Sequence, residues 1–116
     1  MTQLTIEYEI ARRQRDEGMD RALDKAERDV PKWGDLALDW LRRYAETHEE
    51  FPGWFVTQGA ELDPNFPKAK GQAWGAIWVR AQKAGIVRDS GKRMPHPRRH
   101  GCPAVVWTSL VFLAAA

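Results

Sequence analysis

Lysine and arginine are concentrated in one stretch of the sequence, from Lys68 to His100. This stretch holds nine basic residues and one acid, Asp89, whereas the residues before Lys68 include nine basic and fifteen acidic ones. The formal net charge of +2 for the whole chain conceals this asymmetry. A concentrated positive field attracts polyanions, so the pattern predicts contact with nucleic acid before other partners.

The first half of this stretch reads as a helix whose exposed face could contact DNA. Glutamine offers a base edge both a donor and an acceptor, and a lysine or arginine can reach guanine or a phosphate. The residues expected to contact DNA from this face are Gln72, Val79, Arg80, Gln82 and Lys83. An ordinary solvated face with two glutamines would show the same pattern.

The second half reads as a basic loop stiffened by Pro95, Pro97 and Pro103. Arginine on such a loop can hold phosphates or enter a narrow minor groove. The residues expected to do so are Arg88, Lys92, Arg93, Arg98 and Arg99, with His96 and His100 adding charge as the pH falls. The alternatives are a disordered basic loop that binds nucleic acid without preference, and a patch for an acidic protein partner.

Metal binding and catalysis have little support in the sequence. His96, His100 and Cys102 have the spacing of three metal ligands, but no fourth ligand and no Cys-x2-Cys pair lies nearby. There is no Gly-rich phosphate loop, nucleophile elbow or His-Glu-x-x-His motif. We therefore expect a protein that is not an enzyme and that binds neither a metal nor a cofactor.

The N-terminal segment, residues 1–29, is expected to be helical with a break or frayed end near Gly18, and its first seventeen residues to be weakly attached or used against a partner. Met19, Ala22, Leu23, Ala26 and Val30 share one face, while Ile6 and Ile10 lie out of phase with them. Glycine inside a helix costs about 1 kcal/mol relative to alanine. The acids of this segment alternate with Arg and Lys, which is typical of a solvated face, although they could also form a surface for a protein partner.

Two stronger helices follow. The range 32–47 carries a wide apolar stripe, which predicts a core helix: Trp33, Leu36, Ala37, Trp40, Leu41 and Tyr44. The range 72–84 should face inward through Ala73, Trp74, Ile77, Ala81 and Ala84, and end at Gly85. Its small outward residues, Gly75 and Ala76, would let the backbone approach DNA closely. Between these helices, Pro52 could open a short helix carrying Trp54, Phe55 and Val56 inward.

The C-terminal region predicts a β-hairpin. Ile86 and Val87 begin an extended run, a turn-rich basic loop spans 89–103, and a β-type run returns over 104–108. The expected fold is therefore α+β and mainly helical: a winged helix-turn-helix over 30–109, with an extra N-terminal helix and a C-terminal β-hairpin wing. The last helix of such a fold lies in the major groove of DNA.

The remaining features bear on the core, the cellular compartment and contact with a membrane. Six tryptophans suit a small core, and stacking on bases would need one of them exposed beside the basic stretch. The single cysteine, Cys102, fits a reducing cytoplasm, and no signal peptide is visible. The apolar tail, 110–116, is far shorter than the roughly 20 residues that span a bilayer, so it should dock on the body or hang loose.

Several segments resemble a group of short, mostly uncharacterised phage and prophage proteins of proteobacteria. They are Val30–Ala37, Gln72–Ile77, Lys83–Val87 and Arg98–Gly101, and the resemblance covers roughly Asp20 to Trp107. It implies a winged-helix-like fold and a phage origin, without an established activity. Members of this group end soon after the position of Trp107, so the apolar tail, 110–116, departs from the pattern of the group.

Two functions from different classes follow. The preferred one is non-enzymatic DNA binding in the cytoplasm of a bacterial host, as a phage regulator or accessory replication factor. The alternative is a phage effector that occupies a host protein complex, including a defence complex such as CRISPR-Cas, through its acidic N-terminal helix. A homodimer through Ile6, Ile10 and Met19 is a third possibility.

Overall fold

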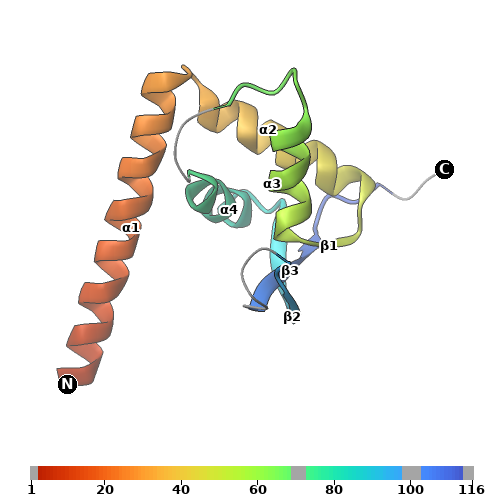
Figure 1. Ribbon diagram of the computed structural model, residues 1–116. Coiled ribbons are helices and arrows are strands. Elements are labelled where there is room, and N and C mark those ends of the chain that lie inside the picture. Colours follow the sequence, from red (N-terminus) through yellow and green to blue (C-terminus); the bar gives the residue numbers. More distant parts are fainter. Residues whose placement is uncertain (1–2, 69–72, 98–102, 114–116) are drawn as a thin grey trace.

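In the described part of the chain, four helices and three strands follow the order α1–α2–β1–α3–α4–β2–β3 (Figure 1). The computed structural model describes residues 3–68, 73–97 and 103–113, and for residues 3–8 the backbone alone. The helices are α1 (Gln3–Asp29), α2 (Trp33–Thr47), α3 (Gly53–Leu62) and α4 (Trp74–Lys83); the strands are β1 (Glu50–Pro52), β2 (Val87–Pro95) and β3 (Pro103–Ser109). The protein is α+β and mainly helical, as expected, and the order is compatible with a winged helix.

The three strands form one antiparallel sheet in the order β1–β3–β2. Trp107 in the central strand lies between Phe51 and Asp89, and the next residue, Thr108, lies between Glu50 and Arg88. Residues opposite each other on neighbouring strands share a face. The row of Phe51 and Trp107 is buried, so Arg88 and Glu50 lie on the other face of the sheet.

The hairpin prediction is confirmed, but the expected loop from Asp89 is wrong. Strand β2 continues to Pro95, with an irregularity in the pairing between Asp89 and Arg93. Gly91 has a φ of 83°, a conformation that glycine adopts without strain. The bulge therefore absorbs the turn-forming residues Asp89-Ser90-Gly91 without ending the strand.

The core receives one large side chain from each of five elements. The largest fully buried side chains are Leu41 of α2, Phe51 of β1, Val56 of α3, Ile77 of α4 and Val87 of β2. Each contributes roughly 1.5–3 kcal/mol through burial. Strand β1 was not expected, because a three-residue strand is too short to show a period-2 pattern.

The expected break in the first helix is wrong. Helix α1 is continuous from Gln3 to Asp29, and a Cβ added at Gly18 would meet nothing within 4 Å. The i to i−4 hydrogen bonds run through glycine as through any non-proline residue, so its cost weakens the helix without ending it. The part that packs on the body begins at Met19 and includes the buried Leu23 and Ala26.

The other helices follow the sequence closely, with three corrections. The expected inward residues Ala73, Ile77 and Ala81 of the last helix region are buried, and Gly85 adopts a φ of 73° just after it. Leu36 is 42% exposed, Phe55 is 47% exposed and Ala84 is exposed, although all three were expected inside. They lie at the margins of their apolar stripes, where the surface of the helix turns from the core toward solvent.

The chain after β3 docks on the body as far as it is described. The amide N–H of Leu110 donates to the Ile86 carbonyl at 2.9 Å, and that of Leu113 to the Glu46 carbonyl at 3.0 Å. Val111 packs against the core, while Leu110, Phe112 and Leu113 stay exposed. None of the helices in the described residues combines the length and apolar character needed to cross a membrane.

Candidate nucleic-acid interface

Gly75, in the N-terminal half of α4, packs against Met19 of α1, and its neighbour Ala76 is buried. A Cβ added at Gly75 would lie 3.5 Å from the Cε of Met19 in α1, and Ala76 is 7% exposed. The expectation that these small residues let the backbone approach DNA is therefore wrong. The small size of Gly75 instead lets α1 pack close to α4 (Figure 1).

Arg80 lies where three helices meet. The point at which Gly34 of α2 would carry a Cβ is 2.9 Å from Arg80 Nη1 and 2.7 Å from the Oε1 of Glu27 in α1. The guanidinium and the carboxylate thus lie close together above Gly34, on an exposed edge of the molecule. The positive charge of Arg80 is partly offset at this position.

The C-terminal end of α4 carries the remaining helix candidates. Gln82 and Lys83 are exposed, whereas Val79 is half-buried. The Nε2 of Gln82 donates to the Trp78 carbonyl at 3.3 Å, so its side chain folds back on its own helix. Gln72 lies outside the described residues. The exposed polar surface of α4 is therefore smaller than the sequence suggested and lies next to the start of β2.

The described cations of the hairpin divide between the two faces of the sheet. Arg88 is exposed opposite Thr108 and has no ion-pair partner among the described residues. Lys92 Nζ lies 2.9 Å from the Oε1 of Glu50, the residue on the other side of Thr108. Both side chains are at least a third exposed, and such surface pairs contribute roughly 0–1 kcal/mol. A phosphate can therefore replace Glu50 at Lys92 at little cost.

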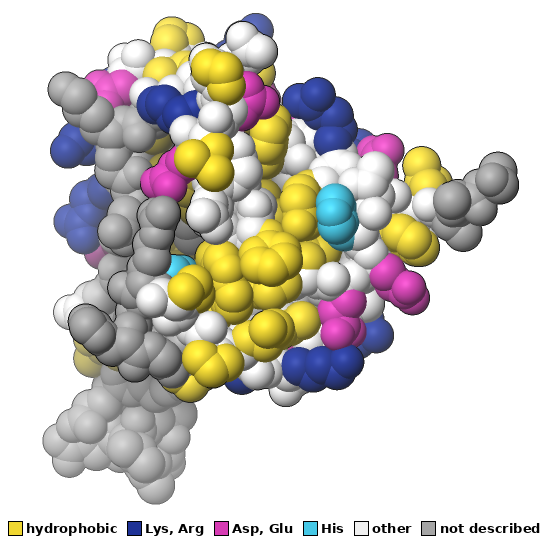
Figure 2. All heavy atoms as spheres, turned by 45° about the vertical axis from the view of Figure 1, so that its right-hand side comes forward, with side chains coloured by type: hydrophobic (Ala, Val, Ile, Leu, Met, Phe, Trp, Pro, Cys, Tyr) yellow, Lys and Arg dark blue, Asp and Glu magenta, His cyan; other side chains and the backbone are white. Residues whose placement is uncertain are grey.

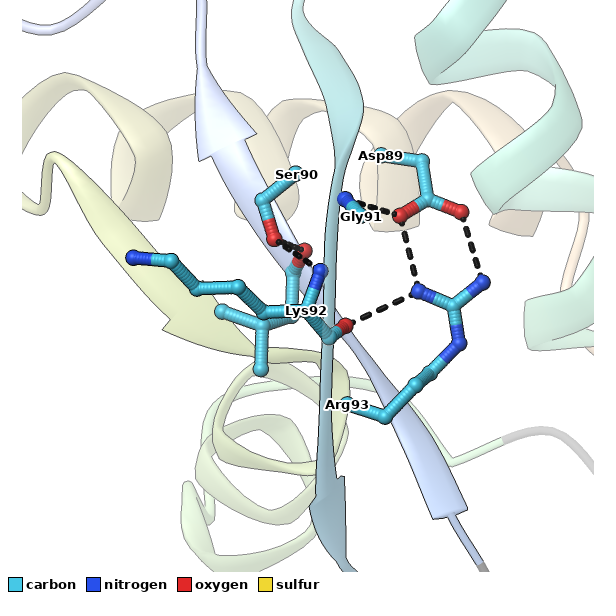
Figure 3. Close-up of polar contacts among 6 residues, drawn as sticks. Asp89, Ser90, Gly91, Lys92 and Arg93 are labelled. Atoms are coloured by element: carbon cyan, nitrogen blue, oxygen red, sulfur yellow. Dashed lines mark hydrogen bonds and ion pairs between the residues drawn. The ribbon is translucent and has the colours of Figure 1, made fainter.

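Arg93 is held more firmly, by Asp89. Its Nη1 and Nη2 lie 2.9 and 3.0 Å from the two carboxylate oxygens of Asp89, and Nη1 also donates to the Lys92 carbonyl at 2.8 Å (Figure 3). The Arg93 hydrogen bonds and the N–H of Gly91 hold the pKa of the Asp89 carboxyl below its usual value. The one acid of the basic stretch is thus used to orient an arginine within the bulge.

The tip of the hairpin lies outside the described residues, and with it Arg98, Arg99, His100 and Cys102. The part that the structure describes contains no group of three potential metal ligands. The His96 ring lies 5.2 Å from the ring of Trp54, so this histidine borders aromatic side chains rather than extending the basic surface.

An aromatic cleft is the feature that sequence reasoning missed. Helices α3 and α4 and strand β3 enclose a volume of about 700 Å³, with a lining that includes five of the six tryptophans. One signal was available: Trp74 and Trp78 are four residues apart and lie on one side of their helix. Placing Trp54 and Trp107 on the same cleft required the fold.

Met19 is also unavailable for the expected dimer surface, because it packs within the chain against α4. Ile10 is 49% exposed, and the side chain of Ile6 lies outside the described residues.

Charged side chains lie toward the edges of the face drawn in Figure 2, and its centre is hydrophobic.

Comparison of the chain with protein-family models, with curated proteins and with solved structures found no match.

Proposed function

We propose that the protein is a non-enzymatic DNA-binding protein of winged-helix type, acting in a phage context as a regulator or accessory replication factor. The observation that carries this proposal is the topology together with the charge of its hairpin. The order helix, strand, helix, helix and hairpin, over α2 to β3, with the first strand beside the last, is compatible with a winged helix and supports the proposal. The extra helix α1 precedes this unit.

The hairpin, used as the wing, would contact the phosphate chain. Arg88 and Lys92 share the outer face of the sheet, and Lys83 at the end of α4 is separated from Arg88 by a short turn. A groove-reading role for the start of α4 is disfavoured, because Met19 covers Gly75 there. Phosphate contact with little sequence preference is the form of binding that this geometry favours.

The test is the salt dependence of binding to a short DNA duplex. Each phosphate contact contributes roughly 0.9 to the slope of log K against log salt, so Arg88→Ala combined with Lys92→Ala should flatten the slope by about two units. Arg98→Ala with Arg99→Ala should have a similar effect. The matched control is Arg12→Ala with Arg13→Ala, which removes the same charge from an exposed part of α1. No duplex binding, or a slope unchanged in the hairpin variants, contradicts the proposal.

A second candidate is a phage effector that binds a host protein complex, for example a defence complex such as CRISPR-Cas. The observation that favours it is the N-terminal half of α1, which extends away from the other helices (Figure 1) and is exposed throughout residues 9–17. A long helix that packs with one end alone offers its free end to a partner. The native mass of the protein purified from its host, with and without nuclease, separates a protein partner from bound nucleic acid.

A further inference from the structure

The aromatic cleft has the size and the walls of a ligand site. Its volume of about 700 Å³ falls within the roughly 300–1,000 Å³ typical of such sites. Its aromatic lining comes from four elements and from the loop after α3: Trp33, Trp54, Phe66, Trp74, Trp78 and Trp107.

Three of these rings remain partly exposed. Trp54, Trp74 and Trp78 are each half-buried, whereas Trp33 is 3% and Trp107 8% exposed. Buried rings hold two of them in place, Trp74 and Trp78, while Trp54 contacts the rings of Phe55 and His96. Trp107 stacks on Trp78 with centroids 4.8 Å apart and planes 5° apart, and Trp33 meets Trp74 edge to face at 5.4 Å. The exposed ring surfaces are therefore fixed before any ligand binds.

The cleft also contains a polar group without a partner. The indole Nε1 of Trp33 is buried and has no hydrogen-bond acceptor among the described residues. This nitrogen is closed to solvent, so it does not select the occupant of the cleft. The exposed ring faces do, and nucleobases offer flat aromatic faces that stack on such rings.

Cations border the cleft on two sides, each with partners within the protein: Arg93 is paired with Asp89, and Lys68 donates to backbone carbonyls. Val105 and Trp107 line it from β3, and the residues opposite them on β2, Arg93 and Asp89, share their face of the hairpin. Lys68 lines the other side, where its Nζ donates to the carbonyls of Ala60 and Phe66. Glu61 contributes one acid to the lining. Aromatic platforms beside basic side chains are the combination that binds single-stranded nucleic acid.

We propose that this cleft binds unpaired bases of a single-stranded nucleic acid. The bases stack on Trp54, Trp74 and Trp78, and the phosphate chain passes along the hairpin at Arg93. This inference rests on the proposed nucleic-acid function and adds a ligand class to it: the outer face of the hairpin contacts phosphates, whereas the cleft holds bases.

The first experiment uses the full-length protein and its intrinsic tryptophan fluorescence. Oligothymidylate of about ten nucleotides is compared with an abasic oligomer that has the same number of phosphates, a length within the site sizes of roughly 4–16 nucleotides seen in single-strand binders. Stacking should quench the fluorescence and give oligothymidylate about tenfold higher affinity than the abasic oligomer. Equal affinities overturn the inference, because binding would then come from phosphates alone.

The second experiment locates the site. Trp54→Ala should weaken oligothymidylate binding about tenfold and leave abasic binding unchanged, while Trp54→Phe keeps most of the affinity. Leu62→Ala is the matched control, since Leu62 also belongs to α3, is 74% exposed and does not line the cleft. Equal losses in Trp54→Ala and Leu62→Ala overturn the assignment. The oligomer comparison on the unchanged protein decides the matter if Trp54→Ala does not fold.

The two proposals can fail separately. If duplex DNA binds with the expected salt dependence but the bases add nothing, the cleft inference fails and the proposed function stands. If neither duplex nor single strands bind, both fail, and an aromatic partner peptide becomes the better occupant of the cleft.

Discussion

Met19 of α1 lies directly over Gly75 of α4, with its Cε 3.5 Å from the point where a side chain on Gly75 would begin. This contact joins the N-terminal helix to the helix expected to read DNA. It occupies the half of α4 that a DNA groove would need, and Met19 also lines the aromatic cleft. One contact thus limits base reading by α4 and helps to form a second surface.

Enlarging Gly75 tests this contact. Gly75→Ala should leave the fold intact and raise the free energy of unfolding by up to about 1 kcal/mol, because 3.5 Å is an ordinary contact and alanine favours the helix. Gly75→Leu should lower it by roughly 1–3 kcal/mol, since the added atoms must displace Met19. Thermal unfolding, with hydrogen exchange in the range 19–29, measures both effects. Similar stabilities for the two variants would mean that α1 is not held at this point.

Gly18 and Gly85 should respond to alanine in opposite directions. Gly18 lies inside α1 with open space around it, so Gly18→Ala should stabilise the protein by about 1 kcal/mol or raise its helicity. Gly85 has a φ of 73°, so Gly85→Ala should destabilise it by roughly 1–2 kcal/mol. Circular dichroism during thermal unfolding distinguishes the two. A helix that breaks at Gly18 would instead gain far more helicity than one residue accounts for.

Asp89 should titrate below the usual range of a carboxyl. Because its folded-state pKa is lowered, the stability it contributes is present above the unfolded value of about 3.9 and is lost as the pH falls through the folded value. Arg93→Ala should raise the Asp89 pKa toward its usual value, as seen by NMR of the carboxyl carbon. An unchanged midpoint in that variant would show that Arg93 does not hold the charge.

The same pair gives a prediction for binding. Asp89→Asn removes an acid and the bidentate partner of Arg93, which frees the guanidinium for a phosphate. Affinity for DNA should rise, and its salt slope should steepen by about 0.9. A fall in affinity would mean that the orientation given by Asp89 matters more than the charge released. Glu50→Gln is the parallel variant at Lys92.

Ser109 should be the polar residue on which the C-terminal docking depends. Its Oγ donates to the Ala45 carbonyl at 2.7 Å and accepts the N–H of Val111 at 3.2 Å, and the residue is 9% exposed. Ser109→Ala leaves both groups without this partner and should cost about 1–3 kcal/mol. Denaturant unfolding measures the loss. Thr108→Ala, on the neighbouring and more exposed position, is the control and should cost much less.

The topology of helices and hairpin could largely be predicted from the sequence, because apolar periodicity and turn residues act locally. The stripe around Leu41 predicted α2, and Gly85 marked the end of α4. The strand β1 could not be predicted, since three residues carry no period. The extension of β2 past Asp89 was equally hidden, because a turn sequence and a bulge use the same residues.

The sequence alone determined the charge asymmetry, the α+β class and the exposed cations Lys83, Arg88 and Lys92. These follow from composition and short-range pattern, which do not depend on what packs where. The tertiary structure decided that Gly75 faces another helix, which acids pair with the hairpin cations, and that five tryptophans meet at one cleft. Such contacts join residues far apart in the chain, so they exist only when α1, α3, α4 and the hairpin pack together.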